Sequence, residues 1–289
     1  MSTLLADTPL SHRIDLVSAV NGRAYRLRVA EPLTPPPAGG WPVLLVLDGD
    51  AYFGLMTDAM RNRGCLGHEI DPPLVVAIGY PDDDPQAWHV RRQLDYTPED
   101  PPAGTLAPGP FGGLDGFLDT IETHILPLLA QRFVIDRDAV ALFGHSLGGL
   151  AVLYGLCTRP RLARSWLAVS PALWCAPAAL ASAERMLPSR LGAARPRVHI
   201  AVGGLEEEPP RWRPPGSVLT LDAAARQVAF ARIRGRAQAF AHALRRHASL
   251  TVRYDDLPGE THVSVPYAAL RMAFDLAFPW PGEREALDV

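Results

Sequence analysis

The sequence contains no lysine, and all 28 of its basic residues are arginines, set against 31 acidic residues. The formal net charge of −3 excludes the basic excess that draws proteins to nucleic acids or to anionic membranes. No basic stripe with interleaved aromatic residues is present either, so we expect no nucleic-acid partner. Because arginine stands at every basic position, and alanine and proline are abundant, we interpret its use as a coding bias rather than as anion recognition.

Cysteine is also scarce. The three cysteines, Cys65, Cys157 and Cys175, are widely spaced and form neither a C-x-x-C pair nor a zinc-ligand pattern. They predict reduced, buried thiols. No apolar run approaches the roughly 20 residues of a membrane-spanning helix, and residues 1–9 lack the basic start of a secretory signal. We therefore expect a cytoplasmic protein without a membrane partner.

Apolar runs alternate with helical patterns along most of the chain, which has 289 residues, 48% of them hydrophobic. Buried strands are expected at 42–47, 74–78, 139–143, 165–169, 197–202 and 250–254, and helices at 51–65, 147–158, 222–247 and 265–278. This alternation predicts an α/β fold with a mostly parallel central sheet and helices on both faces. No repeat or domain boundary is visible, so a single domain over residues 1–289 is expected, with its core at about 12–278.

Two regions depart from this alternation. Residues 12–17 and 25–29 alternate between apolar and polar side chains around Asn21-Gly22, which predicts a hairpin of antiparallel strands at the N-terminal edge of the sheet. Residues 80–113 are rich in proline, glycine and aspartate and show no periodic pattern. They predict a loop insertion at the carboxyl edge of the sheet, where ligands of open α/β sheets bind.

One short motif carries the chemistry. Gly144-His145-Ser146-Leu147-Gly148 joins an apolar strand run to a helical run, which is the G-x-S-x-G motif in its strand–turn–helix setting. We expect a strained backbone at Ser146, with Gly144 and Gly148 allowing the strand and the helix to approach closely. Ser146 Oγ would then project above the sheet edge as a nucleophile. The alternative is a glycine-rich turn that holds a serine by chance.

A serine hydroxyl is a weak nucleophile, which needs a base to take its proton and a third group to orient that base. His262 is the candidate base, because it lies in a loop between the last strand and the last helix, from where it can reach Ser146. The other histidines that follow Ser146 suit this role less well. His199 lies in an apolar strand run and is expected in the core, whereas His242 and His247 are expected on the surface of a helix.

The orienting acid is expected in the loop after the strand 197–202. Three carboxylates stand there, and Glu206 is closest to the strand end, with Glu207 and Glu208 as alternatives. Asp255 and Asp256 precede the histidine loop and are weaker candidates. With any of the three glutamates, the chain order is serine, acid, histidine, which is the order of the α/β-hydrolase fold.

The transition state of acyl transfer carries an oxyanion, which fixed N–H groups must stabilise. One donor is expected to be the backbone N–H of Leu147, directly after the nucleophile. The other is expected in the turn after the strand 42–47, from the backbone of Gly49 or Asp50.

These motifs together resemble one family. The chain is similar to the esterase-D-like esterases of the α/β-hydrolase superfamily, and within them most to the siderophore esterases that open enterobactin, salmochelin and ferri-bacillibactin trilactones. The matching stretches are 46–49, 92–98, 112–117, 144–149, 170–174, 203–206 and 259–262.

The resemblance implies a serine hydrolase that uses no cofactor and no catalytic metal. It also implies that Arg92 lies near the active site, where a guanidinium suits an anionic or carbonyl-rich ligand; a structural pairing with Asp95 is the alternative. Trp174 would line an acyl or aromatic pocket, or else pack in the core. Some siderophore esterases manage with a serine–histidine pair, which leaves the need for Glu206 open.

The sequence therefore predicts a serine carboxylic-ester hydrolase that acts through an acyl-enzyme. Its expected partner is a small-molecule ester, and the resemblance points to a siderophore ester or trilactone, with or without ferric iron. The alternatives are a general short-acyl or feruloyl-type esterase, an acyltransferase with the same residues, and a binding protein that has lost catalysis. The oligomeric state is left open.

Overall fold

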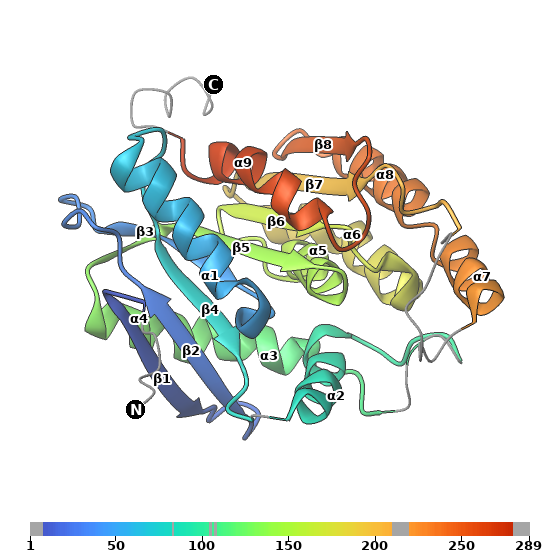
Figure 1. Cartoon of the computed structure of the whole chain (residues 1–289), viewed down its shortest axis with the longest axis horizontal. Helices are drawn as coiled ribbons and strands as arrows, with labels where there is room; N and C mark the ends of the chain where they lie inside the picture. The colour runs from blue at the N-terminus through green and yellow to red at the C-terminus, as the bar shows by residue number, and fades with distance from the viewer. Residues whose placement is uncertain (1–7, 83, 104–105, 107–108, 210–219, 280–289) are drawn as a thin grey trace, which may run out of the picture.

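The computed structural model describes residues 8–82, 84–103, 106, 109–209 and 220–279. Within them, eight strands form a sheet with the order β1-β2-β4-β3-β5-β6-β7-β8 (Figure 1). The strands are β1 Ser11–Val17, β2 Ala24–Ala30, β3 Trp41–Val46, β4 Leu74–Gly79, β5 Ile135–His145, β6 Ser165–Val169, β7 Arg197–Gly203 and β8 Thr251–Leu257. The strands β3 to β8 pair in parallel, whereas β1 and β2 pair antiparallel at one side of the sheet. The predicted α/β fold and the N-terminal hairpin are confirmed.

Helices cover both faces of this sheet, which explains the continuous apolar strand runs (Figure 1). One face packs against α1 Gly49–Met60 and α9 Val265–Ala277, together with the π-helical turn η1 Arg61–Leu66. The other face packs against α3 Leu114–Thr120, η2 Ile121–Ile125, α4 Leu126–Arg132, α5 Leu147–Thr158, α6 Pro177–Leu191 and α8 Ile233–Leu244. Successive strand residues alternate between the two layers: Leu44 and Val46 face α1, and Leu45 faces the opposite layer.

The expectation of a structureless insertion at 80–113 is wrong, because α2 Pro85–Tyr96 lies within it. Asp84 caps this helix by accepting a hydrogen bond of 2.9 Å from the Gln86 N–H, and proline stands at the first helical position. The sequence carried this start signal. The side chains that the helix buries most completely include the polar Gln93 and Asp95, so its buried face does not follow an apolar helical period.

A single helix over 222–247 is also wrong. It divides into α7 Leu221–Ala231 and α8 Ile233–Leu244, separated by Arg232 in the left-handed conformation at φ 43°. The break lets the two helices take different directions (Figure 1). The nearest glycine, Gly235, lies three positions beyond the break and inside the first turn of α8, so the sequence does not mark the break itself.

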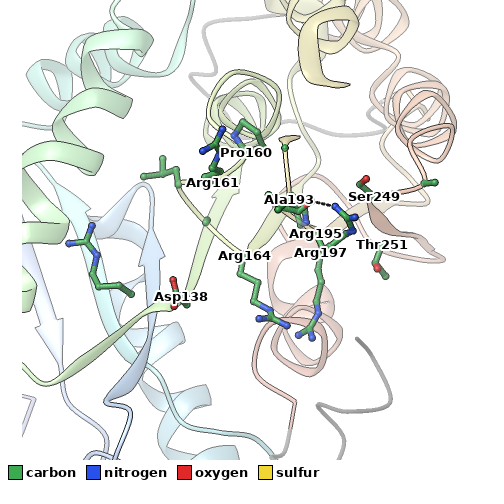
Figure 2. A pocket seen from close by; sticks show the side chains of 16 residues that line it. Asp138, Pro160, Arg161, Arg164, Ala193, Arg195, Arg197, Ser249 and Thr251 are labelled. Carbon is green, nitrogen blue, oxygen red and sulfur yellow. Dashed lines mark hydrogen bonds between the residues drawn. The ribbon is translucent and has the colours of Figure 1, made fainter. Parts of the chain in front are cut away.

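The amino ends of β5 to β8 surround a hollow of about 800 Å³ (Figure 2). Its lining is rich in arginine, contributed by Arg137, Arg161, Arg164, Arg195 and Arg197. The residues predicted to carry the chemistry all follow carboxyl ends of strands instead. Since parallel strands present their two ends at opposite edges of the sheet, this hollow lies away from Ser146.

Candidate active site

The backbone of Ser146 is strained, with φ 60° and ψ −117° in a residue other than glycine. Neighbouring segments hold it there: the Ser146 N–H donates to Val169 O over 3.0 Å, and the Ser146 carbonyl accepts from the Ala172 N–H over 3.0 Å. Such a conformation persists only where the surroundings fix it, and it turns the serine side chain out above the end of β5.

Only one of the two motif glycines makes the expected close approach possible. A Cβ on Gly144 would lie 2.2 Å from the Gly148 carbonyl oxygen, so no other residue fits between the strand and the helix. A Cβ on Gly148 would make ordinary contacts, the nearest at 3.5 Å. Gly149 is the more restricted neighbour, because its Cβ would lie 2.9 Å from Pro171 Cα.

The structure brings Ser146, His262 and Glu206 into one hydrogen-bonded row. His262 Nε2 lies 3.2 Å from Ser146 Oγ, and His262 Nδ1 lies 3.0 Å from Glu206 Oε2. The three residues follow β5, β8 and β7, so three loops at the carboxyl edge of the sheet supply them. A serine that donates to Nε2 requires the proton of a neutral imidazole on Nδ1, where it is donated to the carboxylate. This is the tautomer that lets Nε2 accept the serine proton.

Glu206 is buried, with 7% of its surface exposed, and its second oxygen is also satisfied. The Gly203 N–H donates to Oε1 over 2.6 Å, and the Ser170 hydroxyl donates to the same atom. Two donors on Oε1 and the imidazole N–H on Oε2 fix the plane of the carboxyl group.

The other candidate acids face elsewhere. Glu207 is exposed and accepts a hydrogen bond from the Gly235 N–H over 2.8 Å, and Glu208 is exposed as well. Asp255 pairs with His199 over 2.8 Å, and Asp256 pairs with Arg234 over 2.6 Å. Of these carboxylates, only Glu206 contacts the imidazole of His262.

The remaining histidines lie mostly where the sequence placed them. His199 is buried in β7 with 1% of its surface exposed. His242 is exposed on α8. His247 is half-buried, 3.0 Å from a Glu184 oxygen.

The proposed oxyanion donors stand at the starts of two helices that meet near Ser146. Leu147 is the first residue of α5, and Gly49 and Asp50 are the first two residues of α1. Backbone N–H groups in the first turn of a helix have no acceptor within that helix, so they can serve an outside oxygen. The two helix starts are close, since a Cβ on Gly148 would lie 3.5 Å from both Asp48 Oδ2 and Leu47 Cβ.

Arg92 lies at this site but is held by a carboxylate of the protein. Its Nε and Nη2 donate to Asp48 over 2.6 and 3.0 Å, with only 11% of the Arg92 side chain and 4% of the Asp48 side chain exposed. Burial alone would lower the pKa of this guanidinium, but the Asp48 carboxylate raises it, so Arg92 stays charged. The alternative pairing with Asp95 is wrong, since Asp95 pairs with Arg23 over 2.9 Å.

Trp174 follows β6 in the short helix η3 Leu173–Cys175, and 7% of its surface is exposed. It packs edge-to-face against Phe230 of α7, with 6.0 Å between the ring centroids. The ring therefore packs with the apolar core and with α7.

Sequence reasoning missed two polar residues that support the row. Ser170 holds Glu206, and His145 hydrogen-bonds the His262 carbonyl over 2.8 Å. Ser170 directly follows the end of β6, and His145 lies directly before Ser146. Their partners are 36 and 117 positions away, however, and only the fold reveals them.

Among the described residues, no group of three or more histidine, cysteine or acidic side chains is arranged to hold a metal ion. None of the helices described is long and apolar enough to cross a membrane.

Comparison with known proteins places the chain in a family. The sequence profile of the family described as "Putative esterase" matches residues 18–245. A siderophore triacetylfusarinine C esterase from Aspergillus fumigatus is 31% identical over 274 residues, which cover 90% of this chain and 91% of that protein. The ferri-bacillibactin esterase BesA from Bacillus subtilis is 34% identical over 197 residues, which cover 64% of this chain and 67% of that protein.

The fold agrees with these matches. The siderophore hydrolase EstB from Aspergillus nidulans superposes with a TM-score of 0.81 at 27% identity, covering 96% of this chain and 99% of that one. The expected α/β-hydrolase fold and the expected resemblance to siderophore esterases are confirmed. Since the profile spans most of the sequence, this chain belongs to the family described as "Putative esterase".

Proposed function

We propose that this protein is a serine carboxylic-ester hydrolase in which Ser146 is the nucleophile, His262 the general base and Glu206 the group that orients the base. The observation that carries the proposal is the hydrogen-bonded row from Glu206 through His262 to Ser146, with distances of 3.0 and 3.2 Å, built on a strained turn. Family membership and the esterases among its relatives support the same activity.

The reaction runs in two halves. His262 Nε2 takes the Ser146 hydroxyl proton while Oγ attacks the ester carbonyl, and the tetrahedral intermediate collapses as the same proton passes to the leaving alkoxide. Water then attacks the acyl-enzyme, with His262 accepting its proton and returning it to Ser146. The Glu206 carboxylate stabilises the imidazolium that forms in each half and holds the ring plane.

The oxyanion of each intermediate lies, in this proposal, between the N–H of Leu147 and the turn at Gly49 and Asp50. The positive ends of α5 and α1 add to this stabilisation. Loss of one such donor in other enzymes costs about 10²–10³ in rate. The main-chain turns are therefore as important to the mechanism as the three side chains.

The activity is tested with p-nitrophenyl acetate and with a fluorophosphonate probe. We expect the wild type to hydrolyse the ester and to bind the probe at Ser146, and Ser146→Ala to lower kcat by roughly 10⁴-fold or more. Ser165→Ala is the matched control. Ser165 is buried at the amino end of β6, whereas Ser146 lies at the carboxyl edge of the sheet. A Ser146→Ala protein with the wild-type rate would refute the proposal.

For the substrate, we propose a siderophore ester or trilactone. Three curated relatives are named as esterases of ferri-bacillibactin, triacetylfusarinine C and apo-salmochelin, so relatives of this chain act on several chemically different siderophores. The comparison to make is kcat/KM for catecholate trilactones and hydroxamate ester siderophores, each with and without ferric iron, against p-nitrophenyl acetate and methyl ferulate. If the simple esters were cleaved as well as every siderophore, a general esterase would replace this proposal.

A further inference from the structure

His145, the residue before the nucleophile, makes two hydrogen bonds that the proposed mechanism does not use. Its Nε2 lies 2.8 Å from the backbone oxygen of His262, and its Nδ1 lies 2.9 Å from the Tyr52 hydroxyl. The His145 residue is buried, with 7% of its surface exposed. Its ring lies beside that of His262, with 4.5 Å between the centroids.

The proton positions on the His145 ring follow from its two hydrogen-bond partners. A carbonyl oxygen can only accept, so His145 Nε2 carries a hydrogen and donates it to the His262 oxygen. Burial lowers the pKa of His145 to about 3, and the nearby His262 and Arg92 add to this effect. The ring is therefore neutral at working pH, Nδ1 is an acceptor, and the Tyr52 hydroxyl donates to it.

We infer that His145 is a positioning residue for His262: its Nε2–H fixes the His262 main chain, while Glu206 fixes the ring of the same residue. This inference rests on the proposed function. The two anchors act at different atoms of one residue, one at the carbonyl oxygen and one at Nδ1. With both in place, the main chain and the ring of His262 are each fixed by a hydrogen bond, and Nε2 is directed toward Ser146.

The chain anchors His145 itself on two sides. Tyr52 comes from α1, where its ring packs edge-to-face against Phe143 with 5.7 Å between centroids. On the other side, Arg92 Nη2 lies 3.4 Å from the His145 backbone oxygen. The anchor for the histidine loop is thus built from rigid elements of the sheet and its helices, which is what precise placement of a base requires.

The neutral state of His145 suits this role. During the reaction His262 becomes an imidazolium, and a second cation at 4.5 Å between ring centroids would oppose that charge. A buried imidazole that stays neutral supplies the N–H donor without adding a charge beside His262. A lysine or arginine at position 145 would supply a donor but would oppose the imidazolium.

The test uses His145→Leu, which removes the donor, and His145→Gln, whose side-chain amide can place an N–H near the position of Nε2. For His145→Leu we expect kcat for p-nitrophenyl acetate to fall about 10- to 100-fold with KM within twofold of wild type, as for a base displaced by up to about 1 Å. The rate of fluorophosphonate labelling of Ser146 should fall by the same factor. His145→Gln should recover most of both rates.

The matched control is His199→Leu in β7, which also removes a buried, hydrogen-bonded histidine of the sheet but touches none of the proposed catalytic residues. It should lower the melting temperature and leave kcat near wild type. If His145→Leu proves too unstable to assay, Tyr52→Phe decides, because it removes only the hydroxyl that orients the ring. A kcat two- to fivefold lower at unchanged KM would support the inference, and an unchanged kcat would overturn it.

The outcomes separate this inference from the proposed function. A wild-type protein that neither hydrolyses esters nor binds the probe at Ser146 refutes the proposed function. An active wild type with His145→Leu equally fast, or with His145→Gln as slow as His145→Leu, refutes only the positioning role of His145.

Discussion

Glu206 is the residue whose surroundings say most about its role. Its two carboxylate oxygens serve different partners: Oε2 contacts the His262 ring at 3.0 Å, and Oε1 accepts from Gly203 and Ser170. A carboxylate fixed on one side by two donors presents its other oxygen at a defined angle. The neighbouring Glu207 has the same charge and lies one position away, but it is exposed and bonds to Gly235.

Glu206→Gln should therefore separate orientation from local charge. The amide can donate to Nδ1 and so stabilise the wrong imidazole tautomer, with Nε2 protonated and unable to accept from Ser146. We expect kcat to fall roughly 10³- to 10⁴-fold, by analogy with the loss of the orienting acid in other serine hydrolases. Glu207→Gln is the control and should keep the wild-type kcat. Equal rates in the two variants would mean that a serine–histidine pair suffices here.

The residue roles that could be proposed from the sequence are those marked by a short motif or by the order of residues along the chain. Ser146 carries a motif, and His262 follows from loop position and chain order. Glu206 was one of three adjacent carboxylates, and the sequence favoured it only for its nearness to the strand end. The supporting contact of His145 joins residues 117 positions apart. No periodicity or spacing encodes such a contact, because it exists only once β5 and the loop after β8 meet.

At the scale of elements, α2 fastens the turn that carries the proposed oxyanion donors. Arg92 and Tyr96 are four positions apart and so lie on one face of the helix. Arg92 pairs with the Asp48 carboxylate, and the Tyr96 hydroxyl accepts from the Asp48 N–H over 2.9 Å. Asp48 itself is left-handed, at φ 54°. The insertion thus holds a strained turn in place.

Arg92→Lys tests this function, because it keeps the charge and loses the two-pronged contact with Asp48. If α2 positions the turn, kcat should fall about tenfold with little change in KM. If Arg92 instead binds the substrate by charge, the change should appear mainly in KM for an anionic siderophore. Arg91→Lys is the matched control, since Arg91 pairs with Asp82 at a more exposed position and should change neither constant.

The edge strand β8 is joined to β7 by a hydrogen bond between the side chains of Asp255 and His199, and this contact makes stability depend on pH. Asp255 lies 2.8 Å from buried His199 Nε2 and 2.6 Å from Arg253 Nε. The hydrogen bond from His199, together with Arg253, lowers the pKa of Asp255 to about 2. A folded-state pKa below the unfolded value of about 3.9 stabilises the protein above that pH. The contribution is lost as the pH falls from about 4 toward 2.

Asp255→Asn should therefore destabilise the protein at pH 7 by about 1 kcal/mol, since solvent partly screens the pair. The difference from wild type should shrink as the pH is lowered toward 3. Urea unfolding midpoints at pH 7, 5, 4 and 3 measure it. Asp256→Asn, which breaks the exposed pair with Arg234, should change the midpoint less at every pH. A constant difference for Asp255→Asn across this range would contradict the assigned pKa.

Strands and helices were predicted correctly where the hydrophobic pattern is regular. They were missed where a helix cap or a single backbone conformation sets the boundary of a helix. The buried strands from β3 to β7 were visible as apolar runs, because helices cover both faces of the sheet there. The expectation of a buried strand at 250–254 is wrong, since β8 lies at the edge of the sheet and is partly exposed. The helix α2 was missed, since its stability comes from a cap at Asp84 and from tertiary contacts rather than from an apolar stripe. The division between α7 and α8 at Arg232 was missed because left-handed arginine has no sequence signature.

At the scale of the whole molecule, the sheet has a carboxyl edge and an amino edge, and it lies between two layers of helices. The proposed catalytic residues follow β5, β7 and β8 at the carboxyl edge, while the arginine-lined hollow lies at the amino edge (Figure 2). The general arrangement could be predicted, since the order of strands and helices dictates which loops share an edge. The spatial strand order and the register could not, because they depend on which apolar strands pair in the folded sheet.

The three cysteines are distributed over both layers of the hydrophobic core. Cys65 packs with the layer of α1 and α9, whereas Cys157 and Cys175 pack in the opposite layer. All three are free thiols, and at most 7% of the surface of any of them is exposed. Burial raises the pKa of Cys175 to about 12 and also raises the pKa of Cys157, so neither is a reactive thiolate in the folded state.

Because each strand contributes alternate side chains to both layers, neither layer can open without exposing the sheet that the other one covers. We therefore expect all three thiols to react with iodoacetamide through the same global unfolding event, at one shared rate that rises with guanidinium concentration. Peptide mass spectrometry of samples taken below the unfolding midpoint distinguishes the three sites. Faster modification of Cys65 alone would show that the layer of α1 and α9 opens independently, because the intrinsic reactivities of the thiols are similar once they are exposed.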